Sequence, residues 1–243
     1  MDWRNEAKKR AAVEAVKHVR DGFVVGLGSG STAAFAIKEI GRAVQEKSIK
    51  VLGVPTSHQA FILAIECGIP ITTLNEHPKL DLCIDGADEI DRELNLIKGR
   101  GGGAIMREKI VASAAEKLLI IADETKLTQR LGTNHPLPLE ILPFAERVVS
   151  AKLGELGGTP ILRERGDKSG PFITDNGNFI LDLHLGPIEN LSELDLKLRS
   201  IPGVIETGLF IGMTDIAYVG TATGLKRMVG KRRSTIQSLN ETL

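Results

Sequence analysis

Acidic side chains, a lysine and a glycine loop lie together between positions 81 and 109, in the stretch DLCIDGADEIDRELNLIKGRGGGAIMREK. An apolar run with strand character is followed by four carboxylates, those of Asp85, Asp88, Glu89 and Asp91. Lys98 then precedes a loop with glycine at 99 and 101–103, and Glu108 follows at the start of an expected helix. Carboxylates, an ammonium group and bare backbone N–H groups in one segment favour a site that moves protons on an anionic substrate.

Asp85 and Asp88 stand three residues apart after the expected strand, so they can project into one pocket. Like charges held that close raise one pKa, which suits acid–base work on hydroxyl and carbonyl groups. Two other interpretations stay open, a solvated acidic turn and a divalent metal site. The segment DGADEID lacks EF-hand spacing, and the five histidines are scattered along the chain. No GxSxG motif is present, which disfavours an acyl-transfer hydrolase.

Glu108 directly follows the glycine loop, where a partly desolvated carboxylate can remove a proton from a carbon next to a carbonyl. The alternative is a helix N-terminal glutamate that interacts with the helix dipole. Lys98 and Lys126 are each typical of surface lysines when taken alone. Their positions on either side of the acidic and glycine segments favour a role with a phosphate or a developing oxyanion. The glycine loop is either an oxyanion cradle or a flexible hinge.

A second small-residue segment, Gly28-Ser29-Gly30-Ser31-Thr32, follows the buried strand expected at 23–27 and precedes a helix. A strand, a small-residue loop and a helix start form an arrangement that binds anions through backbone N–H groups and the helix dipole. The loop is not a P-loop, and it lacks the last glycine of the dinucleotide fingerprint. Its hydroxyls favour a single phosphate; the alternative is a tight turn that binds nothing.

These segments are positioned by an alternation of strands and helices, which predicts a Rossmann-like α/β domain with a parallel sheet. We expect strands at 49–54, 79–84 and 117–122, and helices at 2–20 and 105–115. From residue 132 the pattern becomes strand, helix, strand, strand, helix, strand, which matches a ferredoxin-like α+β plan. The predicted division is a main domain of 1–131 plus 206–243 and an inserted small domain of 132–205. A strand at 215–219 and a helix in TGLKRMVGKRR are expected to return to the main domain.

Composition narrows the class of protein further. Lysine plus arginine equals aspartate plus glutamate at 31 each, so we expect no nucleic-acid partner. The N-terminus lacks the apolar core of a signal peptide and no run approaches a membrane span, so we expect a cytoplasmic protein without a membrane partner. Cys67 and Cys83 form no CxxC and are interpreted as buried thiols.

Taken together, the chain resembles the A type of ribose-5-phosphate isomerases. The resemblance covers most of the chain in the family's order: GLGSGSTAAFAI (26–37), DGADEID (85–91), LIKGRGGGAIMREKI (96–110), IADETK (121–126), LPLEILPFA (137–145), ITDNGNFILDLH (173–184) and IPGVIETGLF (201–210). One departure is a glycine loop that is one residue longer than the family pattern between Lys98 and Glu108.

The resemblance implies interconversion of ribose 5-phosphate and ribulose 5-phosphate in the non-oxidative pentose phosphate pathway, with no metal or organic cofactor. It implies a small-molecule sugar phosphate as the ligand and a homodimer or homotetramer as the assembly. By matching position Glu108 is the proton-transferring base, and Asp85, Asp88 and Lys98 are the other catalytic candidates. The implied substrate-binding residues are Ser29, Gly30, Ser31, Thr32, Asp85, Gly86, Ala87, Asp88, Lys98, Gly99, Arg100, Gly101 and Lys126.

The mechanism that follows is a hypothesis. The loop 29–32 holds the phosphate, and Asp85 or Asp88 assists ring opening together with Lys98. Glu108 then moves a proton between C1 and C2 through a cis-enediolate. A sugar-phosphate sensor without catalysis is the alternative from another class, because fold does not fix function. A relative of glucosamine-phosphate deaminases or CoA-transferases is a further, weaker alternative.

Overall fold

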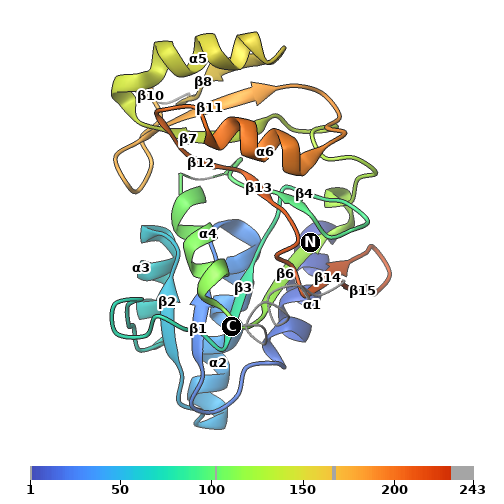
Figure 1. Ribbon diagram of the computed structural model, residues 1–243. Coiled ribbons are helices and arrows are strands. Elements are labelled where there is room, and N and C mark those ends of the chain that lie inside the picture. Colours follow the sequence, from blue (N-terminus) through green and yellow to red (C-terminus); the bar gives the residue numbers. More distant parts are fainter. Residues whose placement is uncertain (1, 102, 166–167, 231–243) are drawn as a thin grey trace, which may run out of the picture.

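A computed structural model describes residues 2–101, 103–165 and 168–230, and it shows two units, one above the other in Figure 1. The lower unit contains a six-stranded sheet in the order β15-β14-β6-β3-β1-β2, in which only β15 runs antiparallel to its neighbour. The strands are β1 (Val24–Leu27), β2 (Leu52–Pro55), β3 (Leu82–Asp85), β6 (Leu118–Asp123), β14 (Ile216–Gly220) and β15 (Leu225–Val229). This sheet confirms the predicted Rossmann-like α/β architecture.

Helices cover both faces of this sheet because its strands are apolar on both sides. In β6, Leu119 and Ile121 join the core formed with α1, α2 and α3, whereas Leu118 and Ile120 join the core formed with α4. Alternate residues of a strand point to opposite faces, so a continuous apolar run needs helices on each. The helices are α1 (Trp3–Val16), α2 (Gly30–Lys47), α3 (His58–Glu66) and α4 (Ile105–Ala114).

The upper unit has a four-stranded antiparallel sheet in the order β12-β7-β11-β8, with α5 and α6 packed against it. This order and the β-α-β-β-α-β sequence of elements confirm the ferredoxin-like plan. The elements are β7 (Leu137–Ile141), α5 (Glu146–Glu155), β8 (Thr159–Leu162), β11 (Phe179–His184), α6 (Leu191–Arg199) and β12 (Val204–Thr207), with a small ribbon of β9 (Glu164–Arg165) and β10 (Lys168–Pro171). The domain bounds at 131/132 and 205/206 stay a prediction, and the second falls inside β12.

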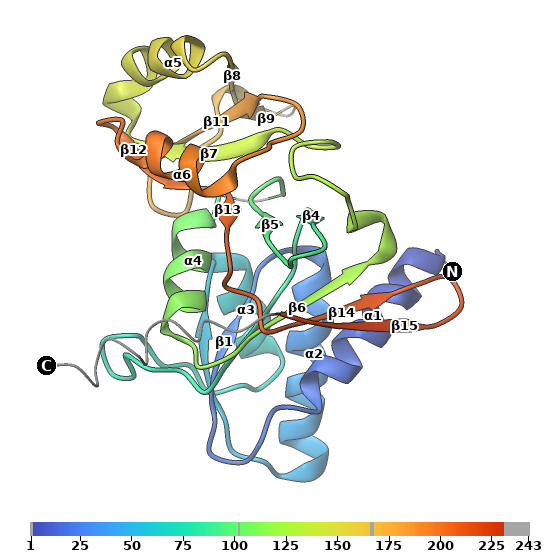
Figure 2. The same cartoon turned by 45° about the vertical axis from the view of Figure 1, so that its right-hand side comes forward.

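A small sheet joins the two units, in the order β13-β5-β4. Its strands are β4 (Glu89–Ile90), β5 (Leu96–Ile97) and β13 (Leu209–Phe210), and two 3-10 turns, η1 (Glu124–Lys126) and η2 (Pro143–Ala145), complete the elements. Figure 2 shows β13 descending from the upper unit beside α4. The chain therefore re-enters the lower unit beside α4, the helix that carries Glu108.

The helix expected in TGLKRMVGKRR is wrong, because residues 225–229 form the edge strand β15. A tight turn, in which the N–H of Thr221 donates to the carbonyl of Gly224 at 2.9 Å, folds the chain back onto β14. The open edge of β14 thus overrides the helix preference of the Lys, Arg and Met side chains. The last residues of that motif, 231–233, lie outside the described part.

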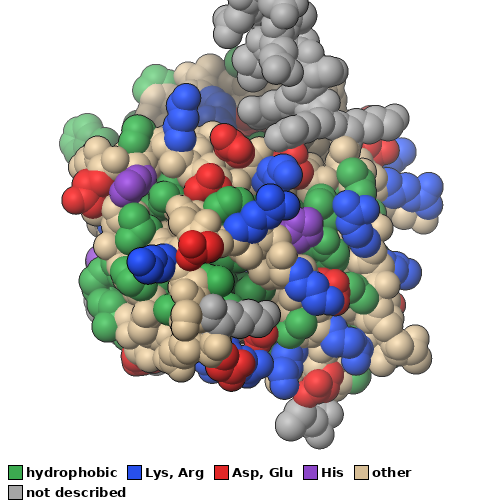
Figure 3. Space-filling view, turned by 90° about the horizontal axis from the view of Figure 1, so that it is seen from below, with side chains coloured by type: hydrophobic (Ala, Val, Ile, Leu, Met, Phe, Trp, Pro, Cys, Tyr) green, Lys and Arg blue, Asp and Glu red, His purple; other side chains and the backbone are tan. Residues whose placement is uncertain are grey.

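The surface agrees with a net charge of zero. On the face shown in Figure 3, lysine and arginine side chains are interspersed with aspartate and glutamate side chains. Within the described residues, no helix combines the length and apolar character that a membrane crossing requires.

Candidate active site

A cavity of about 160 Å³ opens where β1 and β3 end. β2 follows β1 in the chain and lies on one side of it, and the next strand, β3, lies on the other side of β1. The order of the strands thus reverses between β1 and β3, which is the switch point of the sheet. Ligands of open α/β sheets bind in this position. The cavity is lined by Lys8, Ser29, Gly30, Ser31, Thr32, Gly86, Ala87, Asp88, Lys98, Gly99, Gly101, Glu108 and Lys126. Of the predicted site residues, Asp85 and Arg100 are the two outside this lining.

The loop after β1 meets the helix α2 at Gly30, so Ser31 and Thr32 belong to the first turn. Gly30 has a φ of +86°, which a residue with a side chain rarely adopts. The first N–H groups of a helix have no partners inside it and face an anion readily. The hydroxyl of Ser29 is already engaged, with the hydroxyls of Thr56 at 2.7 Å and Ser57 at 2.6 Å. The loop thus offers an anion its helix start and the hydroxyls of Ser31 and Thr32.

Asp85 lies below the floor of the cavity and is almost fully buried. Its Oδ1 accepts hydrogen bonds from the N–H of Ser29 at 3.1 Å and of Gly86 at 2.7 Å. A side chain at Gly28 would collide with this carboxylate, because a Cβ there would lie 2.2 Å from Oδ1. Asp85 therefore links the 29–32 loop to the end of β3.

Lys98 joins two carboxylates at the bottom of the cavity. Its Nζ lies 3.0 Å from Oδ2 of Asp85 and 3.4 Å from Oε1 of Glu108, and it donates to the carbonyl of Gly86 at 2.7 Å. All three charged side chains are buried. The second oxygen of Glu108, Oε2, is buried without a hydrogen-bond partner among the described residues. An orphaned carboxylate oxygen on a cavity wall is available to a substrate.

The pKa values of Glu108 and Lys98 are both raised, with different consequences for their charge at neutral pH. Burial raises the pKa of Glu108 to about 8; the Lys98 ammonium opposes this rise, and the carboxylates of Asp85 and Asp88 add to it. Burial alone would lower the pKa of Lys98, but Asp85 and Glu108 raise it above its ordinary value. At neutral pH the site therefore holds a fixed cation beside a carboxyl group that can both take and give a proton.

Asp88, Arg100 and Lys126 lie at the rim. Asp88 accepts from the N–H of Arg100 at 2.8 Å, and its other oxygen lies 4.0 Å from Nζ of Lys126. The Arg100 guanidinium instead contacts His135, at 3.2 Å between Nη1 and Nε2. Asp88 thus lines the cavity, and the hydrogen bond that its carboxylate accepts from the backbone of Arg100 holds the start of the glycine loop.

Two of the four acids in DGADEID turn away from the cavity. The buried carboxylate of Glu89 accepts from the N–H groups of Gly132, Asn134 and His135. Asp91 accepts from the backbone and side chain of Asn95. In the described part of the chain, no group of three or more His, Cys, Asp or Glu side chains is arranged to hold a metal ion.

Lys8 is the cavity residue that the sequence interpretation missed. It lies on α1, and its Nζ donates to Oγ of Ser31 at 3.4 Å. The residues 8–10 are all basic, so the sequence carries no signal that selects this one.

The sequence matches the family model for Ribose 5-phosphate isomerase A (phosphoriboisomerase A) over residues 52–224. Ribose-5-phosphate isomerase A of Methanothermobacter thermautotrophicus is 49% identical over 90% of this chain and 96% of the relative. The protein of the same name from Methanosarcina acetivorans is 48% identical over 93% and 95% of the two chains.

Solved structures agree in fold. Ribose 5-phosphate isomerase A from Methanocaldococcus jannaschii has a TM-score of 0.89 and 44% identity, and covers 92% of this chain and 98% of its own. A D-ribose-5-phosphate isomerase in complex with phospho-erythronic acid has a TM-score of 0.90 and 43% identity, and covers 93% and 99%.

Proposed function

The chain belongs to the ribose-5-phosphate isomerase A family and is an isomerase of ribose 5-phosphate; we propose that Glu108 is its base and that the reaction passes through a cis-enediolate. The observation that carries this assignment is the buried carboxylate of Glu108. One of its oxygens contacts the Lys98 ammonium and the other has no partner among the described residues. A base with a pKa near the working pH transfers protons in both directions, as a reversible isomerisation requires.

The remaining roles follow from position in the cavity. The first turn of α2 and the Lys8 ammonium bind the phosphate of the substrate. Lys98 stabilises the negative charge that develops on the enediolate oxygens. Asp88 faces the cavity and moves protons on the sugar oxygens during ring opening, while Asp85 orients Lys98 and the 29–32 loop from below.

Ligand chemistry in the family supports this assignment. Phospho-erythronic acid, which is bound in one related structure, carries a carboxylate and a phosphate on a four-carbon chain. Its two carboxylate oxygens resemble O1 and O2 of an enediolate in charge and spacing. In this chain the same pair of oxygens would face Lys98 and Glu108, while the phosphate would reach the start of α2.

We further expect a cytoplasmic homodimer or homotetramer that needs no cofactor. Exposed apolar side chains on α3, those of Phe61, Ile62 and Ile65, support self-association, because such a cluster is costly to leave in water. A fully exposed Phe144 on the upper unit offers a second contact of the same kind.

The test mixes EDTA-treated protein with ribose 5-phosphate and follows ketose formation, alongside Glu108→Gln. We expect turnover that survives EDTA and falls by at least ~10²–10⁴-fold in the variant, because a positioned base is lost. Substrate binding should be largely kept. A near-wild-type kcat in Glu108→Gln would refute the base assignment. Loss of turnover with EDTA alone would make Asp85 and Asp88 metal ligands, and tight binding without turnover in the wild type would favour a sensor.

A further inference from the structure

Lys98 and Glu108 come from different elements, so the distance between them depends on what holds each element. Lys98 follows β5 and Glu108 lies in α4, while the intervening loop has glycine at 99, 101 and 103. The loop is tied to its neighbours, because the carbonyl of Gly99 accepts from Arg163 and that of Gly103 accepts from the N–H of Asp175. The 3.4 Å contact between the two side chains depends in addition on the ties that hold β5 and α4.

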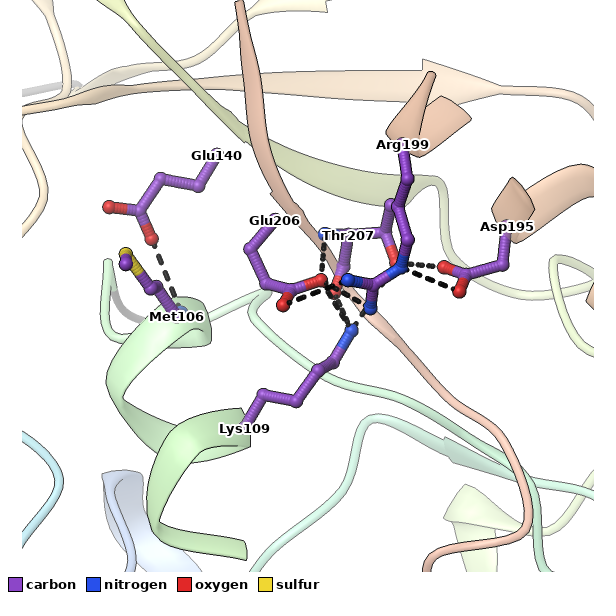
Figure 4. A network of polar contacts seen from close by, with 7 residues as sticks. All are labelled: Met106, Lys109, Glu140, Asp195, Arg199, Glu206 and Thr207. Atoms are coloured by element: carbon purple, nitrogen blue, oxygen red, sulfur yellow. Dashed lines mark hydrogen bonds and ion pairs between the residues drawn. The ribbon is translucent and has the colours of Figure 1, made fainter. Parts of the chain in front are cut away.

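Both elements are attached to one short segment, Glu206–Gly208, which we call the bracket. The N–H of Lys98 donates to the carbonyl of Gly208 at 2.9 Å. From α4, the residue after Glu108 reaches the same segment, because Nζ of Lys109 donates to Oε1 of Glu206 and to the carbonyl of Thr207, each at 2.7 Å (Figure 4). The ring of Phe210 lies close to both ammonium groups, with its centroid 5.5 Å from that of Lys98 and 4.9 Å from that of Lys109.

The bracket is itself held firmly by the upper unit. Glu206 also accepts from the guanidinium of Arg199, at 2.7 Å, and Arg199 is paired with Asp195 on the same helix, α6 (Figure 4). The N–H of Gly208 donates to the carbonyl of Pro138 in β7 at 2.7 Å. Because Lys109, Glu206 and Thr207 are buried and their polar groups satisfy one another, they offer one arrangement rather than several.

We propose that Lys109 and Glu206 are positioning residues for catalysis, which hold α4 on the bracket and thereby set the distance between Glu108 and Lys98. The proposal rests on the proposed roles of those two groups. A second tie holds the first turn of α4, where the N–H of Met106 donates to Oε2 of Glu140 at 3.3 Å (Figure 4). Glu108 lies in this first turn, between the Met106 tie and Lys109, so loss of the Lys109 contact would let its side chain shift away from Lys98.

The test compares Lys109→Met with the wild type in kcat, KM and the pH profile of kcat/KM. We expect kcat to fall about 10- to 100-fold with KM little changed, since a displacement near 1 Å at a reacting group has that cost. The pH midpoint should rise. Burial raises the pKa of Glu108 most; among the charged groups, Lys98 lowers this pKa whereas Asp85 and Asp88 raise it, so a longer distance to Lys98 at unchanged burial raises the midpoint.

Leu153→Ala is the control for stability. It opens the core of the upper unit at a fully buried leucine of α5, away from the bracket, so it should lower Tm but leave kcat and the pH midpoint unchanged. If Lys109→Met lowers Tm while kcat stays within twofold of the wild type and the pH midpoint is unchanged, the pair is only structural and the proposal fails. If Lys109→Met does not fold, Glu206→Gln gives the same comparison with a milder change.

A carbon-13 NMR titration of the Glu108 carboxyl separates this proposal from the proposed function. If Glu108→Gln keeps its turnover, the base assignment fails, yet the midpoint of the Glu108 titration in the other proteins still responds to its contact with Lys98. A higher midpoint in Lys109→Met than in the wild type supports the bracket under either result. An unchanged midpoint overturns it.

Discussion

Two buried lysines, Lys98 and Lys109, both lie close to the Phe210 ring and differ in how their carboxylate partners are satisfied. Around Lys109, both oxygens of Glu206 accept hydrogen bonds. Around Lys98, Oδ2 of Asp85 is paired with the ammonium group at 3.0 Å, but Oε2 of Glu108 is buried without a hydrogen-bond partner among the described residues. The first cluster is complete by itself, whereas the second leaves one acceptor on the cavity wall for a substrate.

The difference separates a structural ion pair from a reactive one. A buried pair whose hydrogen bonds are all made gives a fixed geometry, and removing one partner is costly. A buried carboxyl with one orphaned oxygen can both bind and release a proton near neutral pH, as the raised pKa of Glu108 indicates. Burial and charge are common to both sites, so the orphaned oxygen of Glu108 is the better sign of function.

Lys98→Met tests the reactive side of the comparison and, after Glu108→Gln, should give the largest effect. We expect kcat to fall ~10²–10³-fold, because the site loses the cation that stabilises the developing oxyanion. The matched control is Lys79→Met, which removes an exposed lysine outside the cavity and should leave kcat unchanged. Steady-state kinetics with ribose 5-phosphate measure both. A kcat reduced less than tenfold would show that the Lys98 ammonium does not stabilise the developing oxyanion.

The sequence predicts the parts of this site that are local in the chain. Alternating β and α patterns locate the ends of β1 and β3, and the rule for open sheets then brings Ser29 and Asp88 together. It does not predict which acids of DGADEID face the cavity, because Glu89 turns toward partners at 132–135 that only the fold brings near. Lys8 and the bracket are also missed, since their contacts cross 23 or more positions of sequence.

Stability as a function of pH sharpens the same comparison through Glu108. Its folded-state pKa is raised from 4.5 to about 8, so the folded protein keeps a proton that the unfolded chain releases. The contribution of this group to stability is therefore full below pH 4.5 and is lost as pH rises toward 8. Glu108→Gln lacks this loss. The free energy of unfolding of the variant, relative to that of the wild type, should therefore rise by a few kcal/mol from pH 5 to pH 9, at about 1.4 kcal/mol per pKa unit.

Urea unfolding of both proteins at several pH values measures this difference. Groups other than Glu108 titrate in both proteins, so their contributions cancel in the comparison. Glu155→Gln, a change at an exposed glutamate of α5, should give a curve parallel to that of the wild type. Parallel curves for Glu108→Gln as well would mean that Glu108 titrates as an ordinary exposed carboxyl, and the contrast between the two lysine clusters would lose its basis.

Lys8→Gln should have the smallest effect, because this lysine is half-buried at the outer end of the cavity rather than enclosed in it. If its ammonium binds the phosphate, ground state and transition state lose the same interaction, so KM should rise about 5- to 10-fold with kcat unchanged. Added salt should narrow the gap to the wild type, since exposed charges are screened. Lys9→Gln, at the exposed neighbour on α1, is the control and should change neither constant. A fall in kcat instead would place Lys8 with the reactive cluster and would extend that cluster to the cavity mouth.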